Sequence, residues 1–357
     1  MFLVKKMMKI AHIAPLSLPI PPRGYGGTER AIYSLAAYQK KRGHDVVIFG
    51  MKSEITSDIP ILNLKLPKGL AKVKDLLVFR RGITVYHLYM SQLIASNYGF
   101  DIVHSHIPTE THLAGRFLRK TPMLLTLHHS PALISRYPSM AHVYRIFKVP
   151  CVAISRFQAR QLQNFLHIVS IIYHGIDVDD YPFCKDKEDF LVFIGAIAPH
   201  KAPHLAIEIA KLSDMPLIIA GRVLDDEYFR RIKQSFKTNK IKFIGEISED
   251  LKRKLLCKAR ALLYPVQWDE PFGLALIEAM ACGTPVIGSS KGSLPEIIKD
   301  GETGYICNSV EEYVKAVKKC QELSPTNIRR YVKSHFSVEK MYERYMDVYV
   351  KLLDCMS

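Results

Sequence analysis

Short apolar runs rich in Ile, Leu and Val alternate along the chain with longer segments in which apolar residues recur every three or four positions. The first pattern predicts buried β-strands, and the second predicts amphipathic helices. Their alternation is typical of parallel sheets that carry helices on both faces. The predicted strands are residues 10–14, 46–49, 102–104, 123–127, 152–154, 190–194, 217–220, 242–244 and 261–264, and the predicted helices are residues 28–41, 157–165, 203–212, 226–236 and 249–257.

The alternation is interrupted within residues 173–189, where Gly175, Pro182 and a charged patch separate two strand candidates. A chain of 357 residues is too long for one ordinary core and suits two domains. We therefore predict two Rossmann-like α/β domains, residues 1–174 and 175–336, with ligand bound beyond the carboxyl ends of the strands. The tail, residues 337–357, is predicted to be helical over 337–353, with three tyrosines: Tyr342, Tyr345 and Tyr349.

The composition indicates a compact globular protein, with 48% hydrophobic and 24% charged residues. The net charge of +16 is confined to the first half: residues 1–172 hold 23 Lys and Arg against 7 Asp and Glu, whereas residues 173–357 hold 27 of each. A basic half suggests an anionic partner. Because no zinc-finger spacing or RNA-recognition pattern accompanies the charge, we predict no nucleic-acid partner.

The densest basic cluster alternates with apolar residues. This pattern fits contact with an anionic membrane surface, and it fits equally well a helix with one solvated face and its apolar side on the core. Flotation with anionic vesicles separates the two interpretations. The basic residues are Lys65, Lys68, Lys72, Lys74, Arg80 and Arg81.

The chain has no apolar run of the roughly 18 residues that a bilayer-spanning helix needs. Residues 10–20 follow three lysines but contain His12, Pro15 and Pro19, which is unlike a signal peptide. The seven cysteines are odd in number, scattered and without a C-x-x-C pair, which favours reduced thiols. We expect a cytoplasmic protein, with peripheral attachment to the inner face of the membrane as an open alternative.

The most informative segment spans residues 269–285. Two carboxylates, Glu270 and Glu278, flank a turn and the opening of a helix that Gly283 is well placed to end. Free backbone N–H groups at the helix start and the positive end of the helix dipole attract a phosphate or diphosphate. A nucleotide-sugar fits, because it has a sugar and a ribose diol on the two sides of its diphosphate. The amides are those of Phe272, Gly273 and Leu274.

This segment resembles the signature of the retaining glycosyltransferases of family 4. These enzymes have the GT-B fold, with two Rossmann-like domains, a cleft between them and a C-terminal crossover helix. The resemblance implies that Glu270 contacts hydroxyls of the donor sugar, that the turn amides hold its diphosphate and that Glu278 binds the ribose. It also implies that the tail, residues 337–357, packs back on the N-terminal, acceptor-side domain.

A glycine loop follows the first predicted strand. Three glycines in four residues let the backbone approach a ligand closely, and the helix that follows adds its N-terminus. The loop also resembles the family's N-terminal glycine loop. This makes Gly26 and Gly27 candidates for contact with the donor phosphate and places Tyr25 near the acceptor.

The second domain opens with a strand, a glycine turn at Gly195 and a lysine, Lys201, which would place a cation on the diphosphate. The resembling family usually has an arginine straight after this glycine. Here that position is Ala196, so one of two expected cations is missing. Arg222, which follows a later strand, or His200 could replace it.

His128 ends a predicted strand in the run Thr-Leu-His-His-Ser. By resemblance it is the histidine between donor sugar and acceptor, where a neutral imidazole could hydrogen-bond a sugar hydroxyl. His106, at the end of another strand, is a second candidate for the acceptor pocket. Both are also open to interpretation as core-packed or water-facing histidines. A zinc site is conceivable, but the spacing of the histidines matches no familiar ligand pattern.

The resemblance thus implies a retaining, metal-independent glycosyltransferase that uses no cofactor and takes a UDP- or GDP-linked sugar as donor. The predicted acceptor is a hydroxyl of a glycan, lipid or small molecule, and the expected role is in cell-surface glycan or glycolipid synthesis. Asp177 and Asp179 form a pair of the kind that binds Mn²⁺ or Mg²⁺ in GT-A enzymes, but they fall in what looks like the family's interdomain turn. A non-catalytic nucleotide-sugar binder and an epimerase or hydrolase stay open as alternatives. The predicted catalytic residues are His128, Lys201 and Glu270.

Overall fold

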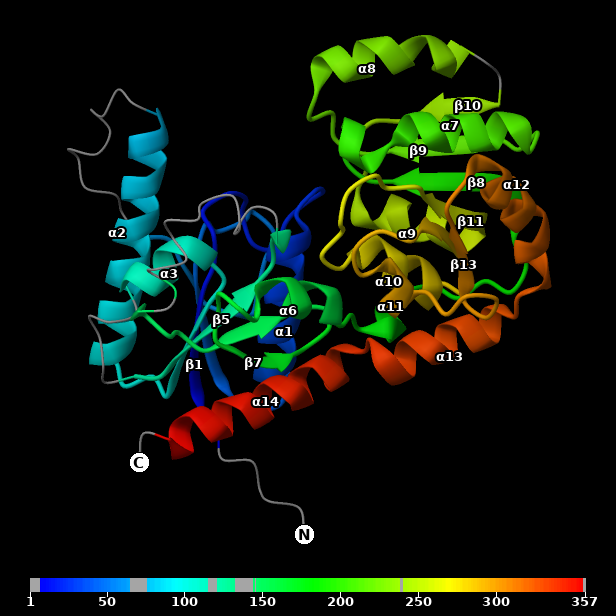
Figure 1. The fold of residues 1–357 in the computed structure, drawn as a ribbon. Helices are drawn as coiled ribbons and strands as arrows, with labels where there is room; N and C mark the ends of the chain where they lie inside the picture. Colours follow the sequence, from blue (N-terminus) through cyan, green and yellow to red (C-terminus); the bar gives the residue numbers. More distant parts are fainter. Residues whose placement is uncertain are drawn as a thin grey trace. The chain divides into compact units, whose positions relative to one another are not determined.

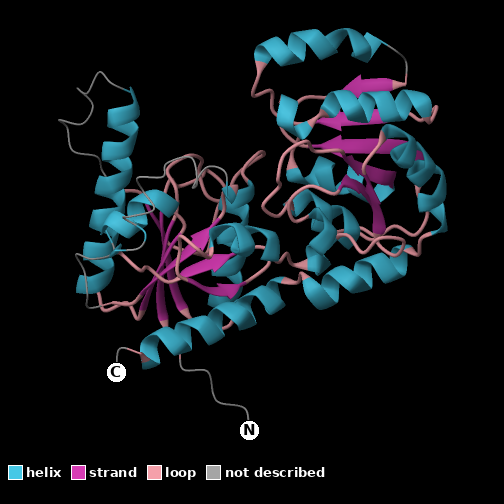
Figure 2. Cartoon of the chain, in the orientation of Figure 1, coloured by secondary structure: helices cyan, strands magenta, loops and turns pink. Residues whose placement is uncertain are grey.

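The chain forms two compact units in the computed structural model, which describes residues 7–64, 76–114, 121–131, 144, 146–237 and 240–355 (Figure 1). Each unit contains one parallel sheet with helices around it (Figure 2). The prediction of two Rossmann-like α/β domains is therefore confirmed. The first unit consists of Met1–Pro22, Gly26–Tyr173 and Met341–Ser357, and the second of Arg23–Tyr25 and His174–Lys340.

The first unit is built on a seven-stranded parallel sheet in the order β3-β2-β1-β4-β5-β6-β7. Successive side chains of a strand point to opposite faces. One face is apolar, where Ala11, Ile13 and Val103 belong to a core cluster that also contains Leu88. The strands are β1 Lys9–Ile13, β2 Asp45–Phe49, β3 Ile61–Leu62, β4 Ile102–Ser105, β5 Met123–Leu127, β6 Cys151–Ala153 and β7 Ile168–Ile171, and the helices are α1 Gly27–Lys41, α2 Leu76–Asn97, α3 Pro108–Ala114 and α6 Arg156–Leu162.

The second unit is built on a six-stranded parallel sheet in the order β10-β9-β8-β11-β12-β13. Apolar residues of its strands pack with apolar residues of the surrounding helices in one core cluster. The strands are β8 Glu188–Ile194, β9 Leu217–Ala220, β10 Ile241–Phe243, β11 Ala259–Tyr264, β12 Val286–Ser289 and β13 Gly304–Cys307. The helices are η2 Val178–Asp180, η3 Pro199–Lys201, α7 Pro203–Leu212, α8 Asp226–Ile232, η4 Lys233–Lys237, α9 Glu249–Lys258, α10 Leu274–Ala281, α11 Leu294–Ile297, α12 Val310–Lys319, η5 Cys320–Glu322 and α13 Pro325–His335.

The last helix, α14 (Val338–Asp354), joins the first unit from Met341 onward. Its tyrosines recur at helical spacing and are buried on that unit. Their hydroxyls hydrogen-bond His44 Nε2 at 2.9 Å from Tyr342, Thr126 Oγ1 at 2.9 Å from Tyr345 and His104 Nδ1 at 2.7 Å from Tyr349. The predicted return of the tail helix to the first unit is confirmed.

The basic cluster falls largely outside the described residues, which resume at Leu76. Arg80 and Arg81 lie in α2, but the positions of their side chains are not described. Across the described ranges, no helix combines the length and the apolar content that a membrane crossing requires. Contact with an anionic membrane stays a prediction.

The expectation that all cysteines are reduced is wrong for one pair. Cys184 and Cys257 form a disulfide, although 73 positions separate them in the sequence. The spacing of cysteines along a chain does not reveal which of them meet in space, and here the segment before β8 passes beside α9. Among the described cysteines, Cys151, Cys282, Cys307, Cys320 and Cys355 are free.

We expect reduction of this disulfide to lower the free energy of unfolding by roughly 2–4 kcal/mol, because a cross-link over a long loop restricts the unfolded chain. Urea unfolding with and without reductant measures the difference. The double variant Cys184→Ser/Cys257→Ser is the control and should be insensitive to reductant. Detection of seven free thiols in protein purified without reductant would contradict the assignment.

Candidate functional site

Glu270 lies in the loop between β11 and α10, and its side chain is buried among three hydrogen-bond donors. Lys201 from η3 forms an ion pair with Oε2. The hydroxyl of Tyr264, at the end of β11, donates to the same oxygen at 2.9 Å, and Trp268 Nε1 donates to it at 3.1 Å. Charge-assisted hydrogen bonds of this kind fix the orientation of a carboxylate.

The second oxygen of Glu270 is placed differently. Among the residues that the structure describes, every hydrogen bond and ion pair of this carboxylate falls on Oε2, and Oε1 has none. An ionised carboxylate is an acceptor only. Oε1 is therefore held in a fixed position from which it can accept a hydrogen bond from a hydroxyl group of a ligand.

Lys201 is enclosed by aromatic rings. Its Nζ lies 4.8 Å from the ring centroid of Trp268 and 5.6 Å from that of Tyr264, within the range of cation–π attraction. Burial, followed by the charge of Glu270, raises the pKa of Tyr264 well above its usual value, so this hydroxyl stays protonated and donating at neutral pH. The Trp268 ring also packs edge-on against His200, with ring centroids 5.0 Å apart.

The start of α10 is shaped by two glycines. Gly273, at φ 91°, precedes the first helical residue, Leu274, and no side chain caps this end. Gly292, at φ 61°, lies against the Glu270 loop so closely that a Cβ would come within 2.4 Å of the Glu270 backbone nitrogen. Ser293 then bonds the carbonyls of Glu270 (2.9 Å) and Phe272 (3.1 Å). The loop after β12 thus holds the Glu270 turn and leaves the helix N-terminus for an anion.

Phe272 and Glu278 point into the second unit. The Phe272 ring packs edge-on against His174 at 5.0 Å, so any contribution to phosphate binding comes from its backbone. Glu278 is buried, and its Oε1 accepts from Lys252 Nζ at 2.8 Å and from the Tyr181 hydroxyl at 3.2 Å. Removing either charge of such a pair would leave the other buried. The predicted contact of Glu278 with a ribose stays a prediction.

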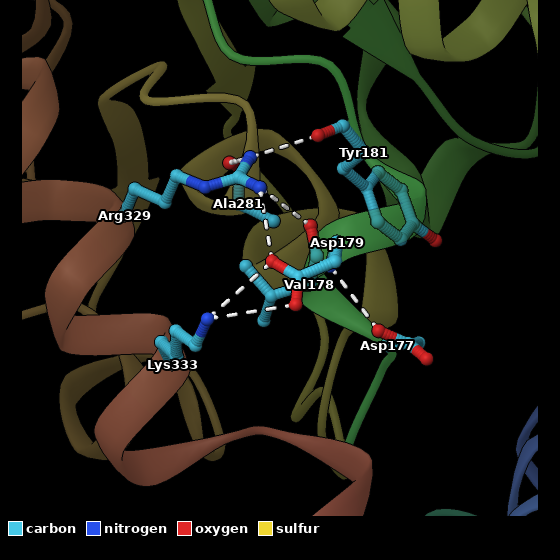
Figure 3. A network of polar contacts seen from close by, with 7 residues as sticks. All are labelled: Asp177, Val178, Asp179, Tyr181, Ala281, Arg329 and Lys333. Atoms are coloured by element: carbon cyan, nitrogen blue, oxygen red, sulfur yellow. Dashed lines mark hydrogen bonds and ion pairs between the residues drawn. The ribbon is translucent and has the colours of Figure 1, made fainter.

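The carboxyl end of α10 is held by two cations, as Figure 3 shows for one of them. Arg329 of α13 donates to the carbonyls of Ala281 (2.6 Å), Tyr181 (2.8 Å) and Val178 (2.9 Å). Lys187 Nζ donates to the Cys282 carbonyl at 3.0 Å. Cations at this end also complement the helix dipole. Both ends of the helix that follows Glu270 are therefore fixed.

Asp177 and Asp179 are used structurally in the same network (Figure 3). Asp177 Oδ1 accepts from the backbone N–H of Asp179 at 3.2 Å and so caps η2. Asp179 Oδ1 lies 3.6 Å from Arg329 and 3.4 Å from Lys333. These contacts give the pair a structural role. The expectation that the protein needs no metal stays a prediction.

Two neighbouring strands end side by side at Gly195 and Gly221. A Cβ on Gly221, at φ 156°, would lie 1.8 Å from the Gly195 carbonyl oxygen, so only glycine permits this approach. Ala196 is 1% exposed and points into the unit. Arg222 is exposed and follows Gly221 directly, and its guanidinium has no hydrogen bond or ion pair among the described residues. A role of Arg222 or His200 as replacement for a cation at position 196 stays a prediction.

The glycine loop is described residue by residue. Gly26, at φ 145°, precedes α1 and is buried, and a Cβ there would meet Pro22 at 2.9 Å. Gly27 is the first residue of α1 and is exposed. Tyr25 is 45% exposed and groups with the second unit. Contacts of these residues with a donor or an acceptor stay predictions.

His106 and His128 follow directly after β4 and β5, and both are buried in the first unit. His106 Nδ1 lies 2.9 Å from His128 Nε2, and His106 Nε2 lies 3.1 Å from His12 Nδ1. Both ring nitrogens of His106 are therefore taken up by other imidazoles. The sequence placed these two histidines at strand ends but did not show that they touch.

Several residues of the site were not predicted from the sequence. Tyr264 and Trp268 lie beside Glu270 in the chain, and an aromatic pair flanking a buried carboxylate was the available signal. For Gly292 and Ser293, the only available signal in the sequence was a glycine that indicates a turn. Nothing in the pattern marked the long-range contacts of Lys252, Arg329 and His12.

Two family models match the chain in succession. Residues 25–180 match Glycosyltransferase Family 4, and residues 182–334 match Glycosyl transferases group 1. An uncharacterized glycosyltransferase of Methanocaldococcus jannaschii is 29% identical over 282 residues, covering 73% of this chain and 78% of that protein. A phosphatidyl-myo-inositol mannosyltransferase of Mycobacterium leprae is 24% identical, covering 84% and 83%.

Solved structures share the architecture. Anabaena HepE in complex with UDP-glucose superposes with a TM-score of 0.76 at 17% identity, covering 96% of this chain and 100% of that one. At this identity the likeness concerns the fold alone. The two sheets, their order and the returning tail helix are those of the GT-B fold, which confirms the predicted fold class.

Proposed function

Because the chain belongs to the family 4, group 1 glycosyltransferases, we propose that it transfers a sugar from a nucleotide-sugar to an acceptor hydroxyl with retention of configuration and without a metal. The donor is UDP- or GDP-linked. The acceptor is a hydroxyl of a glycan, a lipid or a small molecule in cell-surface glycan or glycolipid synthesis. The M. leprae relative is named as a mannosyltransferase, and HepE was solved with UDP-glucose.

The geometry of Glu270 carries this proposal. Three donors hold Oε2, while Oε1 stays open to a ligand hydroxyl among the described residues. The N-terminus of α10 begins a few residues further along the same loop. A carboxylate for the sugar and a helix N-terminus for the diphosphate lie in one segment, as a nucleotide-sugar requires.

In the proposed reaction, negative charge develops on the leaving diphosphate as the bond to the sugar breaks. The α10 amides, Lys201 and Arg222 would stabilise that charge in positions fixed before the bond breaks. The acceptor proton would pass to the leaving diphosphate on the same face of the sugar, so no protein nucleophile is needed. His128 would line this face. The chain's contribution is orientation and electrostatic stabilisation.

A donor screen tests the proposal. UDP- and GDP-sugars are first compared by thermal shift, and the donor that stabilises the protein is incubated with hydroxyl acceptors. Proton NMR of the glycoside then shows whether the anomeric configuration is retained. Inversion would overturn the retaining mechanism. Release of free or isomerised sugar would indicate a hydrolase or epimerase, and binding without turnover would indicate a binder.

We expect Arg222→Ala to raise the KM for the donor about 10-fold or more. A charged hydrogen bond contributes about 1.5–3 kcal/mol, and a contact with the diphosphate is made in the ground state and the transition state alike. Steady-state kinetics at saturating acceptor measures the change. Arg230→Ala removes an exposed arginine of α8 in the same unit and serves as the control. Equal KM values for the two variants would remove Arg222 from the donor site.

A further inference from the structure

One face of the first unit's sheet is lined by histidines. His12 on β1 pairs in register with His104 on β4. His106 lies two residues beyond His104 on the same face, and Thr126 and His128 stand in the same relation on and after β5. All of these side chains are buried. Gln39 of α1 and the tyrosines of α14 cover this face. Buried polar groups need hydrogen-bond partners, and these side chains form hydrogen bonds with one another.

Gln39 sets the direction of the hydrogen bonds. Its Oε1 lies 2.7 Å from His12 Nε2, so His12 carries its proton on Nε2 and accepts at Nδ1. His106 Nε2–H then donates to His12 Nδ1 (3.1 Å), and His128 Nε2–H donates to His106 Nδ1 (2.9 Å). His12 and His106 each accept at Nδ1 and donate at Nε2, so both are neutral and have the same tautomer. The chain of bonds runs from His128 at the strand end to Gln39 in α1.

A second arm starts at the other end of the same amide. Gln39 Nε2 donates to the Tyr349 hydroxyl at 3.3 Å, and this hydroxyl lies 2.7 Å from His104 Nδ1. In the arrangement in which the hydroxyl donates to Nδ1, His104 Nε2–H donates to Thr126 Oγ1, which lies 2.7 Å away. Tyr349 thereby holds the orientation of the Gln39 amide, which in turn holds the tautomers of the first arm. The tail helix is thus linked to His128 through defined hydrogen bonds.

The same cluster has the spacing of a metal site, since ligand atoms of His12, His104 and His106 lie within 4.8 Å of one another. The hydrogen bonds account for these rings without an ion. Each of their six ring nitrogens already has a partner at 2.7–3.1 Å. Burial also keeps the rings neutral by lowering the pKa of His12 to about 4 and that of His104 well below its usual value. In a network of neutral rings, each ring N–H donates to one acceptor and each unprotonated ring nitrogen accepts from one donor.

We propose that Gln39, His12 and His106 are positioning residues that hold His128 in the Nε2–H tautomer and so present its Nδ1 as a hydrogen-bond acceptor. Through Tyr349, the tail helix takes part in this positioning. The role of Nδ1 toward a sugar hydroxyl rests on the proposed function, whereas the tautomer itself does not. Fixing a tautomer decides whether an imidazole can accept or donate at the reacting face.

The tautomers are measured on the unliganded full-length protein. The two-bond proton–nitrogen correlations of ¹⁵N-histidine distinguish Nδ1–H from Nε2–H imidazoles, and His→Asn variants assign them. We expect Nε2–H for His12, His106 and His128 at neutral pH. The reversed tautomer, or a charged ring, overturns the proposal. A stoichiometric zinc ion that is retained through purification and bound to these rings overturns it as well.

A pair of tail-helix variants tests the second arm. Tyr349→Phe removes the hydroxyl that orients Gln39 and is expected to give His128 a mixture of tautomers. Tyr342→Phe removes a hydroxyl of the same helix that bonds His44 instead, at 2.9 Å, and should leave the tautomers unchanged. An unchanged His128 spectrum in Tyr349→Phe would show that the tail takes no part.

Kinetics completes the test. The side-chain oxygen of asparagine can replace His106 Nδ1 as acceptor, whereas leucine cannot. We expect His106→Leu to lower kcat roughly 10- to 100-fold and to change the pH profile, with His106→Asn restoring most of the rate. Equal loss in both variants would mean that His106 acts through packing. A correct tautomer without any glycosyl transfer would leave the positioning intact and refute the proposed function instead.

Discussion

Replacing Glu270 by glutamine is expected to lower kcat/KM by roughly 10²- to 10³-fold, the usual effect of removing a preorganised polar contact with a reacting group. The amide keeps the shape of the side chain but loses the charge that pairs with Lys201. It also replaces one acceptor oxygen with a donor, so the sugar hydroxyl loses its partner. Steady-state rates with the donor found by thermal shift measure the effect.

The matched control is Glu302→Gln. Glu302 also pairs with a lysine, Lys299, at 2.8 Å, and it lies in the loop before β13 of the same unit. This substitution also removes one carboxylate charge, but at a position away from the proposed sugar contact. We therefore expect little change in kcat/KM. The circular dichroism spectra of both variants should match that of the wild type. Near-normal transfer by a folded Glu270→Gln protein would refute the role of Glu270.

Local sequence patterns predicted β8, β9, β10 and β11 of the second unit, whereas β12 and β13 were not among the predicted strands. Each of these four strands contains a short apolar run that stands out from the segments around it. Gly273 and Gly283 lie next to the two ends of α10. Both have positive φ, a backbone conformation that glycine adopts readily, so these glycines marked the helix ends in the sequence. The alternation of strands and helices fixed the two parallel sheets.

Contacts across the fold were not predictable in this way. Lys201 reaches Glu270 across 69 positions and Lys252 reaches Glu278 across 26, and a single sequence does not record which charges pair. His12 was considered only as a polar interruption near the N-terminus. Its role became visible once the register of β1 on β4 placed it beside His104. The histidines belong to different strands, so only the sheet order brings them together.

The buried histidines make stability depend on pH, and His12 is the clearest case. Burial lowers its pKa from 6.5 in the unfolded chain to about 4 in the folded one. Between these values the unfolded chain binds a proton that the folded chain does not. Stability is therefore complete above pH 6.5 and falls as the pH drops, by about 1.4 kcal/mol per pH unit and roughly 3 kcal/mol in total for this residue. His104, His112 and His174 act in the same direction.

Urea unfolding at several pH values between 4 and 7 measures this slope, followed by far-ultraviolet circular dichroism. His12→Asn is expected to lower stability at pH 7, because its bonds to Gln39 and His106 change, but to flatten the slope by about 1.4 kcal/mol per pH unit. His167→Asn removes an exposed histidine and should leave the slope unchanged. The comparison of slopes separates titration from lost packing. A His12→Asn protein with the wild-type slope would show that His12 is protonated in the folded chain, which the neutral histidine network does not allow.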